Sequence, residues 1–100
     1  MWGYTDFMDL DRVKKEMKDR GFVHIYDWHD EPDTEYPAHE HRGEVVLYIV
    51  EGGLTFEFGD ESVSVRTGQW FDVPVGREHS ALVSPEGCTY VVGEMIEGDS

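Results

Sequence analysis

Two histidines, His39 and His41, are separated by one residue in the segment PAHEHRGEVVLYIVEGG. In an extended chain, side chains two positions apart leave the same face, so the two imidazoles can converge on one point. Imidazole suits Zn, Fe, Cu and Ni, and a carboxylate in the ligand set shifts the preference toward Fe and Mn. The pair therefore indicates a divalent metal site, although such pairs also occur on protein surfaces without a metal.

A metal site built on this pair needs a third ligand from elsewhere in the fold. His79 opens the later apolar segment HSALVS, directly after PVGRE, and is the candidate. Glu44 follows the pair closely, but in a regular strand it would point away from both histidines. A bulge at Gly43 would turn Glu44 inward, because glycine accepts the backbone angles that a bulge needs. We therefore predict His39, His41 and His79 as ligands, with Glu44 joining them if the bulge forms.

One helix is expected before the strands, at about residues 9–20. Asp9 is a suitable N-terminal cap, and Leu10, Val13 and Met17 form an apolar stripe at helical spacing. Gly21 follows the last basic turn and is a typical stop signal. The helix is too short and too polar to be stable alone, so we expect it to pack against the rest of the chain.

From Phe22 onward the chain divides into short apolar segments separated by glycine-containing turns. The expected strands cover residues 22–28, 34–39, 44–50, 54–58, 62–66, a stretch within 69–76, 79–84 and 88–95. About eight short strands at this spacing favour an all-β sandwich or barrel over about residues 22–95. His24 lies within the first strand and His29 in the acidic turn after it, and neither is expected in the metal site.

The segment VVLYIV, residues 45–50, is apolar at every position. A strand of this kind is covered on both faces. One face can point into the barrel, and the other needs either a second sheet or a partner subunit. We therefore predict a homodimer, with a second sheet in the same chain as the competing explanation.

Composition limits the classes of partner and location. The chain has 100 residues, which suits a single domain over 1–100, and its net charge is −14 from 22 acidic side chains against 8 lysines and arginines. Such a surface repels nucleic acid and anionic membranes. No stretch is long enough to span a bilayer, and the start lacks the features of a signal peptide. From these features we expect a cytoplasmic protein. The single cysteine, Cys88, excludes an intramolecular disulfide and is expected to pack in the core as a reduced thiol.

Two sequence motifs in this chain resemble those of the cupin superfamily. The segment GQWFDVPVGREH, from Gly68 through Pro74 and Gly76 to His79, looks like the second cupin motif, and HEHRGEVVLYIVEG is similar to the first. The resemblance covers about residues 34–94 and is greatest to small single-domain cupins of the cupin-2 type, a largely uncharacterised group. It implies a jelly-roll barrel, also called a double-stranded β-helix, with a short N-terminal helix.

The resemblance also implies a divalent metal ion, such as Fe, Mn, Zn or Ni, inside one end of the barrel. Carried over by position, His39 and His41 match the ligands of the first motif, and His79 matches the ligand of the second. The acidic ligand is where this chain departs from the family. When the first motif is aligned on Gly52, the ligand position holds Val45, which cannot bind metal.

A histidine-rich metal site in an aromatic-lined barrel fits a small-molecule enzyme such as a dioxygenase or an isomerase. Phe56, Phe58, Trp70 and Phe71 could supply the lining, and Tyr36, Tyr48 and Glu44 are candidates for acid–base chemistry. The alternative is a non-catalytic barrel that holds a small molecule or a metal for sensing or storage. A barrel that has lost its metal site is a third possibility, because one fold hosts all three.

Overall fold

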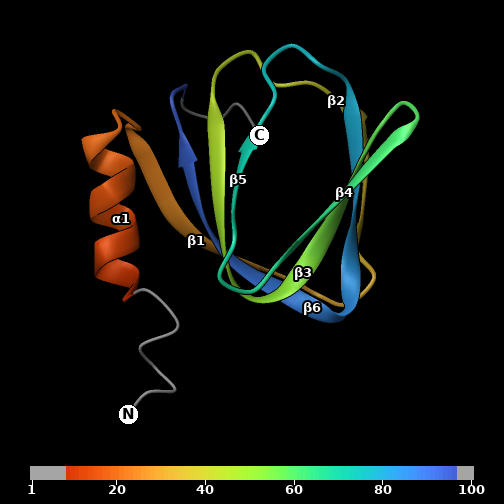
Figure 1. Ribbon diagram of the computed structural model, residues 1–100, viewed down its shortest axis with the longest axis horizontal. Helices are drawn as coiled ribbons and strands as arrows, with labels where there is room; N and C mark the ends of the chain where they lie inside the picture. The colour runs from red at the N-terminus through yellow and green to blue at the C-terminus, as the bar shows by residue number, and fades with distance from the viewer. Residues whose placement is uncertain (1–8, 97–100) are drawn as a thin grey trace.

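The computed structural model describes residues 9–96, which form one helix and six strands (Figure 1). The elements are α1 (Leu10–Asp19), β1 (His24–Asp30), β2 (Glu35–His39), β3 (Val45–Phe58), β4 (Glu61–Arg66), β5 (Trp70–Val73) and β6 (His79–Glu94). All strand pairs are antiparallel: β6 pairs with β1, β2 and β3, and β3 also pairs with β4 and β5. The expected all-β barrel with one short helix is confirmed.

The two longest strands each unite two of the strands expected from the sequence. β3 continues through the glycine pair at Gly52, and β6 continues through Gly87, so six strands replace the eight expected. Both glycines adopt left-handed backbone angles, with φ of 86° and 82°. A glycine in this conformation bends a paired strand without ending it.

The bends of β3 and β6 pack directly against each other. A Cβ atom placed on Gly52 would lie 2.0 Å from the carbonyl oxygen of Gly87, so only glycine allows this approach. Cys88, the register partner of Gly52, is buried beside the bend, and this burial raises its pKa to about 12. The thiol therefore stays protonated and packs as an apolar group, as expected.

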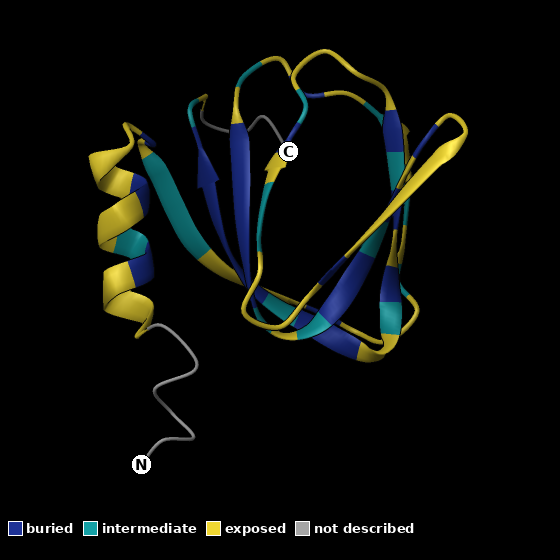
Figure 2. Ribbon diagram, in the orientation of Figure 1, coloured by how far each residue is buried: buried dark blue, intermediate teal, exposed yellow. Residues whose placement is uncertain are grey.

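The apolar segment of β3 is divided between two buried clusters. Val45, Leu47 and Ile49 point into the barrel and join the larger core, whereas Val46 and Tyr48 point outward. The outward side chains pack with Val13 and Met17 of α1 and with Phe22 and Val91. Figure 1 shows α1 on the outside of the barrel, next to β1, and Figure 2 shows its buried side facing the strands.

The helix therefore supplies the cover for which a second sheet or a partner subunit was invoked. The argument for a homodimer from residues 45–50 no longer applies, and the dimer stays a prediction without that support. Among the described residues, α1 lacks the length and the apolar character needed to cross a bilayer.

The N-terminus of α1 is built as its sequence predicts. The carboxylate of Asp9 accepts a hydrogen bond from the backbone N–H of Asp11 at 3.1 Å, which caps the first turn. Gly21 follows the helix with φ of 101°. Because a helix this short is marginal alone, its stability comes from the buried face that it packs against the barrel.

We expect Met17→Ala to lower the free energy of unfolding by about 3 kcal/mol, because the side chain is 0 % exposed and its loss leaves a cavity. Leu10→Ala on the same helix is the matched control, since Leu10 is 37 % exposed and should cost less than about 1 kcal/mol. Urea denaturation followed by circular dichroism measures both values. Equal losses in the two variants would show that α1 does not depend on this buried face.

Candidate metal centre

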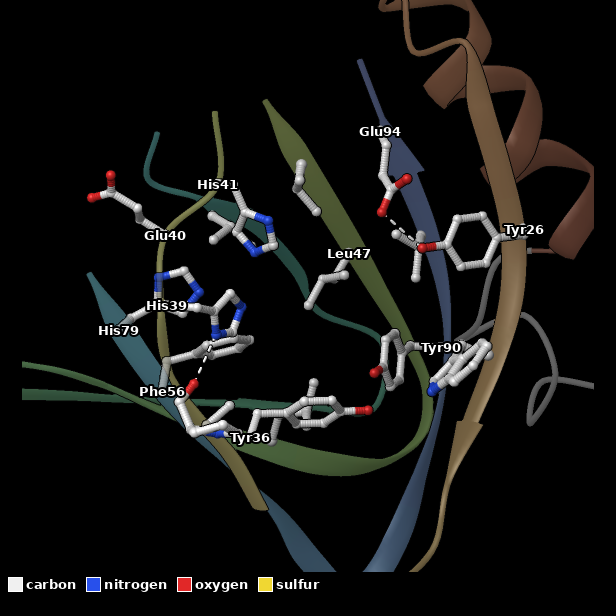
Figure 3. Close-up of a pocket in the computed structure, with 17 residues that line it drawn as sticks. Tyr26, Tyr36, His39, Glu40, His41, Leu47, Phe56, His79, Tyr90 and Glu94 are labelled. Atoms are coloured by element: carbon white, nitrogen blue, oxygen red, sulfur yellow. Dashed lines mark hydrogen bonds between the residues drawn. The ribbon is translucent and has the colours of Figure 1, made fainter. Parts of the chain in front are cut away.

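Three histidine side chains meet at one end of the barrel. His39 ends β2 and is the register partner of His79, which begins β6, while His41 lies in the turn before β3. The ring centroids lie 4.7 Å apart for His39 and His79, 4.9 Å for His39 and His41, and 5.2 Å for His41 and His79. One ligand nitrogen from each ring lies within 4.8 Å of the other two, and Figure 3 shows the three rings together.

Two of the rings are oriented by the backbone just before them. Nδ1 of His39 lies 2.8 Å from the carbonyl oxygen of Pro37, and Nδ1 of His79 lies 2.9 Å from that of Arg77. A carbonyl can only accept, so Nδ1 carries the hydrogen in both rings. In a neutral imidazole this leaves the lone pair on Nε2 for a metal, which is the usual arrangement of metal-binding histidines.

The surroundings of His79 shift its titration. Burial lowers its pKa, and the nearby His39 and His41 lower it further, against an opposing effect of the Arg77 carbonyl. Lowering the pKa favours the neutral form, the form that binds metal. The three imidazoles therefore make a donor set that fits a divalent transition metal ion.

The two loops that carry the histidines are tied together at the mouth of the barrel. The backbone N–H of Gly76 donates to the carbonyl of His41 at 3.0 Å. Val45 and Val73 are register partners at the ends of β3 and β5, just inside these loops. The glycine of the second motif thus holds the first motif in place.

Glu44 lies outside the cluster, and its side chain is exposed. The bulge expected at Gly43 does not form: the residue lies in a bend before β3 and does not have a left-handed φ. A Cβ at Gly43 would lie 2.8 Å from Cγ1 and Cδ1 of Ile96, so a larger residue there would displace this exposed side chain. Glu44 lies two residues before Val46, whose side chain points out of the barrel. Because side chains alternate along an extended chain, Glu44 lies on the same outer side, away from the histidines.

The remaining two histidines of the described chain stay out of the cluster, as expected. His24 lies in β1 opposite Glu94, and Nδ1 of His29 lies 2.8 Å from Oγ1 of Thr89.

The histidines border a cavity of about 490 Å³ inside the barrel, a size typical of small-molecule sites. Of the four aromatic side chains expected to line it, only Phe56 does so. Phe58 and Phe71 pack in the barrel core, and Trp70 packs against Tyr48 on the outer face. Aliphatic side chains line other parts of the cavity, and the remaining aromatic lining comes from Tyr26, Trp28, Tyr36 and Tyr90; the aliphatic residues are Val45, Leu47, Leu54, Val73, Ala81 and Val92.

Two buried carboxylates near this cavity were missed by the sequence analysis. Glu94 is 2 % exposed and accepts a hydrogen bond from the Tyr26 hydroxyl at 2.8 Å. Asp30 is 6 % exposed and accepts from Tyr36, Tyr90 and Trp28. Glu94 could have been found as a single acid within an apolar strand, but Asp30 stands in an acidic turn that gives no such signal.

Comparison with solved structures shows the same fold in several bacterial proteins. A cupin-2 domain containing protein from Shewanella frigidimarina is 20 % identical over 91 % of this chain and 96 % of its own, with a TM-score of 0.63. Protein NMB1881 from Neisseria meningitidis is 30 % identical over 72 % of both chains, with a TM-score of 0.61. The polyketide cyclase RemF from Streptomyces resistomycificus is 21 % identical over 79 % of this chain and 60 % of its own, also with a TM-score of 0.61.

No curated protein matches the sequence of this chain. The family model of the cupin domain, Cupin_2, matches residues 26–92, which is more than half of the chain and includes all three clustered histidines. The chain therefore belongs to the cupin family, as a small cupin-2 domain protein.

Proposed function

We propose that this cupin holds one divalent metal ion on His39, His41 and His79 and uses it to act on a small organic molecule in the barrel. The observation that carries the proposal is the convergence of the three ligand nitrogens, within 4.8 Å of one another, at the wall of a cavity. Three neutral protein ligands leave coordination positions open, which is the arrangement of catalytic rather than structural sites.

The residues of the chain supply positioning and exclusion of water. His39 and His79 are fixed by their hydrogen bonds to backbone carbonyls, so their Nε2 atoms are directed before any metal arrives. Leu47, Leu54 and Phe56 keep the adjoining walls apolar. A divalent ion in this site would supply Lewis-acid polarisation of an oxygen atom of the ligand. Such polarisation suits an enzyme of the isomerase type, and a redox-active ion such as Fe or Mn in the same site would suit a dioxygenase.

The similar structures support this proposal without deciding the reaction. RemF is named a polyketide cyclase, so a barrel of this fold can carry out chemistry on an organic substrate. At 21 % identity the likeness concerns the fold, and the reaction has to be argued from the site.

Removal of one ligand should abolish most of the metal binding. His79→Ala is expected to lower the affinity by more than about a hundredfold, since even residues behind the ligands often change it by 10–100-fold. Metal content is measured by mass spectrometry on protein purified without chelators or a histidine tag. His29→Ala is the matched control, because His29 is exposed and lies outside the cluster. Stoichiometric metal in the His79→Ala protein would refute the assignment.

Glu44→Gln should leave the affinity for Mn²⁺ nearly unchanged, because the exposed Glu44 carboxylate is not among the clustered ligand atoms. Mn²⁺ is the sensitive probe, since it prefers oxygen ligands. Equilibrium dialysis of the wild-type and variant proteins gives the comparison. A loss of about tenfold or more, which corresponds to about 1.4 kcal/mol, would place Glu44 in the ligand set after all.

Metal retention should fall steeply as the pH drops below about 6, because protons compete with the metal for neutral imidazoles. The lowered pKa of His79 means that this ring becomes protonated at a lower pH than an ordinary histidine. A metal-reporting dye follows the release. A carboxylate-dominated site would keep its metal until about pH 4–5, and release only in that range would contradict a site of three histidines.

A further inference from the structure

The side of the cavity formed by β1 and the end of β6 is chemically different from the histidine side. Figure 3 shows Tyr26, Tyr90 and Glu94 across the cavity from the histidines, with Tyr36 extending toward Tyr90. We call these four residues the acceptor wall: Tyr26, Tyr36, Tyr90 and Glu94. Asp30 lies behind them and binds two of the hydroxyls.

Each tyrosine hydroxyl of the acceptor wall already donates its hydrogen to a carboxylate. Tyr26 donates to Oε2 of Glu94 at 2.8 Å, Tyr36 to Oδ1 of Asp30 at 2.5 Å and Tyr90 to Oδ2 of Asp30 at 2.7 Å. A hydroxyl has one hydrogen and two lone pairs, so each of these can offer a ligand only its lone pairs.

The remaining donor at this side is engaged in the same way. The indole N–H of Trp28, which also lines the cavity, donates to Oδ1 of Asp30 at 2.9 Å. Burial, with a further contribution from the hydrogen bond to Asp30, raises the pKa of both Tyr36 and Tyr90. The phenols therefore keep their hydrogens, and the direction of these bonds is fixed at neutral pH.

The charge on this side of the cavity is negative. Glu94 and Asp30 are 2 % and 6 % exposed, so their charges are poorly screened by water. None of the cavity-lining residues in the described part of the chain is a lysine or an arginine. The ligand group that fits this side of the cavity therefore donates hydrogen bonds to the tyrosine oxygens and carries a positive charge.

We infer that the acceptor wall binds the donor end of the ligand, a protonated amine in preference to a hydroxyl, while an oxygen atom at the other end faces the histidines. The ligand class is a small molecule with a carboxylate or carbonyl at one end and an ammonium group at the other. The oxygen end of this inference rests on the proposed metal site. The ammonium end rests on the hydrogen bonds of the acceptor wall and on the buried carboxylates of Glu94 and Asp30, and it does not depend on the metal.

Four probes of one chain length separate these features: ω-aminohexanoate, ω-hydroxyhexanoate, hexanoate and adipate. Each probe carries a carboxylate that can bind a metal. The other end is an ammonium group in ω-aminohexanoate, a hydroxyl in ω-hydroxyhexanoate, a methyl group in hexanoate and a second carboxylate in adipate. Affinities for the zinc-loaded protein are measured by NMR from the indole N–H signal of Trp28, assigned by its loss in Trp28→Phe. We expect the affinities to decrease in the order given, with at least a roughly tenfold difference between ω-aminohexanoate and hexanoate.

Adipate or hexanoate binding as tightly as ω-aminohexanoate, or a Trp28 signal that moves with none of the four, would overturn the inference. A second titration separates it from the proposed function. Butylamine, butanol and butyrate lack one end of the ligand and are added to protein without metal. Butylamine should still shift the Trp28 signal most. If the protein prefers butylamine but fails to bind metal, the metal site is rejected and the acceptor wall stands. If the protein binds metal but shows no preference for butylamine, the acceptor wall is rejected and the metal site stands.

Glu94→Gln tests the contribution of charge. Glutamine keeps an oxygen that can accept from Tyr26 and removes the negative charge. The affinity for ω-aminohexanoate should fall roughly tenfold, and that for ω-hydroxyhexanoate should change much less. Glu57→Gln, the same change at an exposed position of β3, is the control and should alter neither. Unchanged binding of ω-aminohexanoate in Glu94→Gln would contradict the role of the carboxylate.

Discussion

The antiparallel pairing of β3 with β6 is the interaction on which the rest of the structure depends. The two strands pair from Val45 opposite Glu94 to Glu57 opposite Ser80, through two irregularities in register. Every other strand pairs with one of these two. The pairing can follow the curve of the barrel because Gly52 and Gly87 approach more closely than any side chain would permit. The cavity and its lining follow from this curvature.

The positions of the histidine cluster and of the acceptor wall both follow from this pairing. β6 carries His79 at one end and Glu94 at the other, so a single strand reaches both sides of the cavity. Val45 occupies the position at which the resemblance to cupins expects an acid, and its register partner on β6 is Glu94. An acidic side chain thus remains beside that position, but it is bonded to Tyr26 and lies outside the histidine cluster.

Local signals in the sequence were sufficient to predict the ends of α1 and the convergence of His39 and His41. Asp9 and Gly21 mark the ends of α1 because capping depends on the residues themselves, and the spacing of His39 and His41 puts both rings on one side of the chain. The count of strands was not accessible in this way. A glycine at positive φ can end a strand or bend it, and only its partner across the sheet decides which.

The buried acids were hidden for a different reason. With 22 acidic residues in the chain, an individual aspartate such as Asp30 has no feature that separates it from the solvated ones. Its burial depends on hydroxyls from Tyr36 and Tyr90, and Tyr90 is 60 positions away in the sequence. Likewise, the cover that α1 gives to the outer face of β3 joins Met17 to Val46, which no local pattern reveals.

The late position of β6 in the chain has a consequence for how the protein is made. Because β1, β2 and β3 all pair with β6, the barrel cannot close until residues 79–94 have been synthesised. Pairings between such distant segments form slowly, and until then the edges of the earlier strands remain open. His39 and His41 emerge well before His79, so a growing chain presents two imidazoles without the third. The three ligands of the proposed metal site therefore come together only when the barrel closes, after synthesis of residues 79–94.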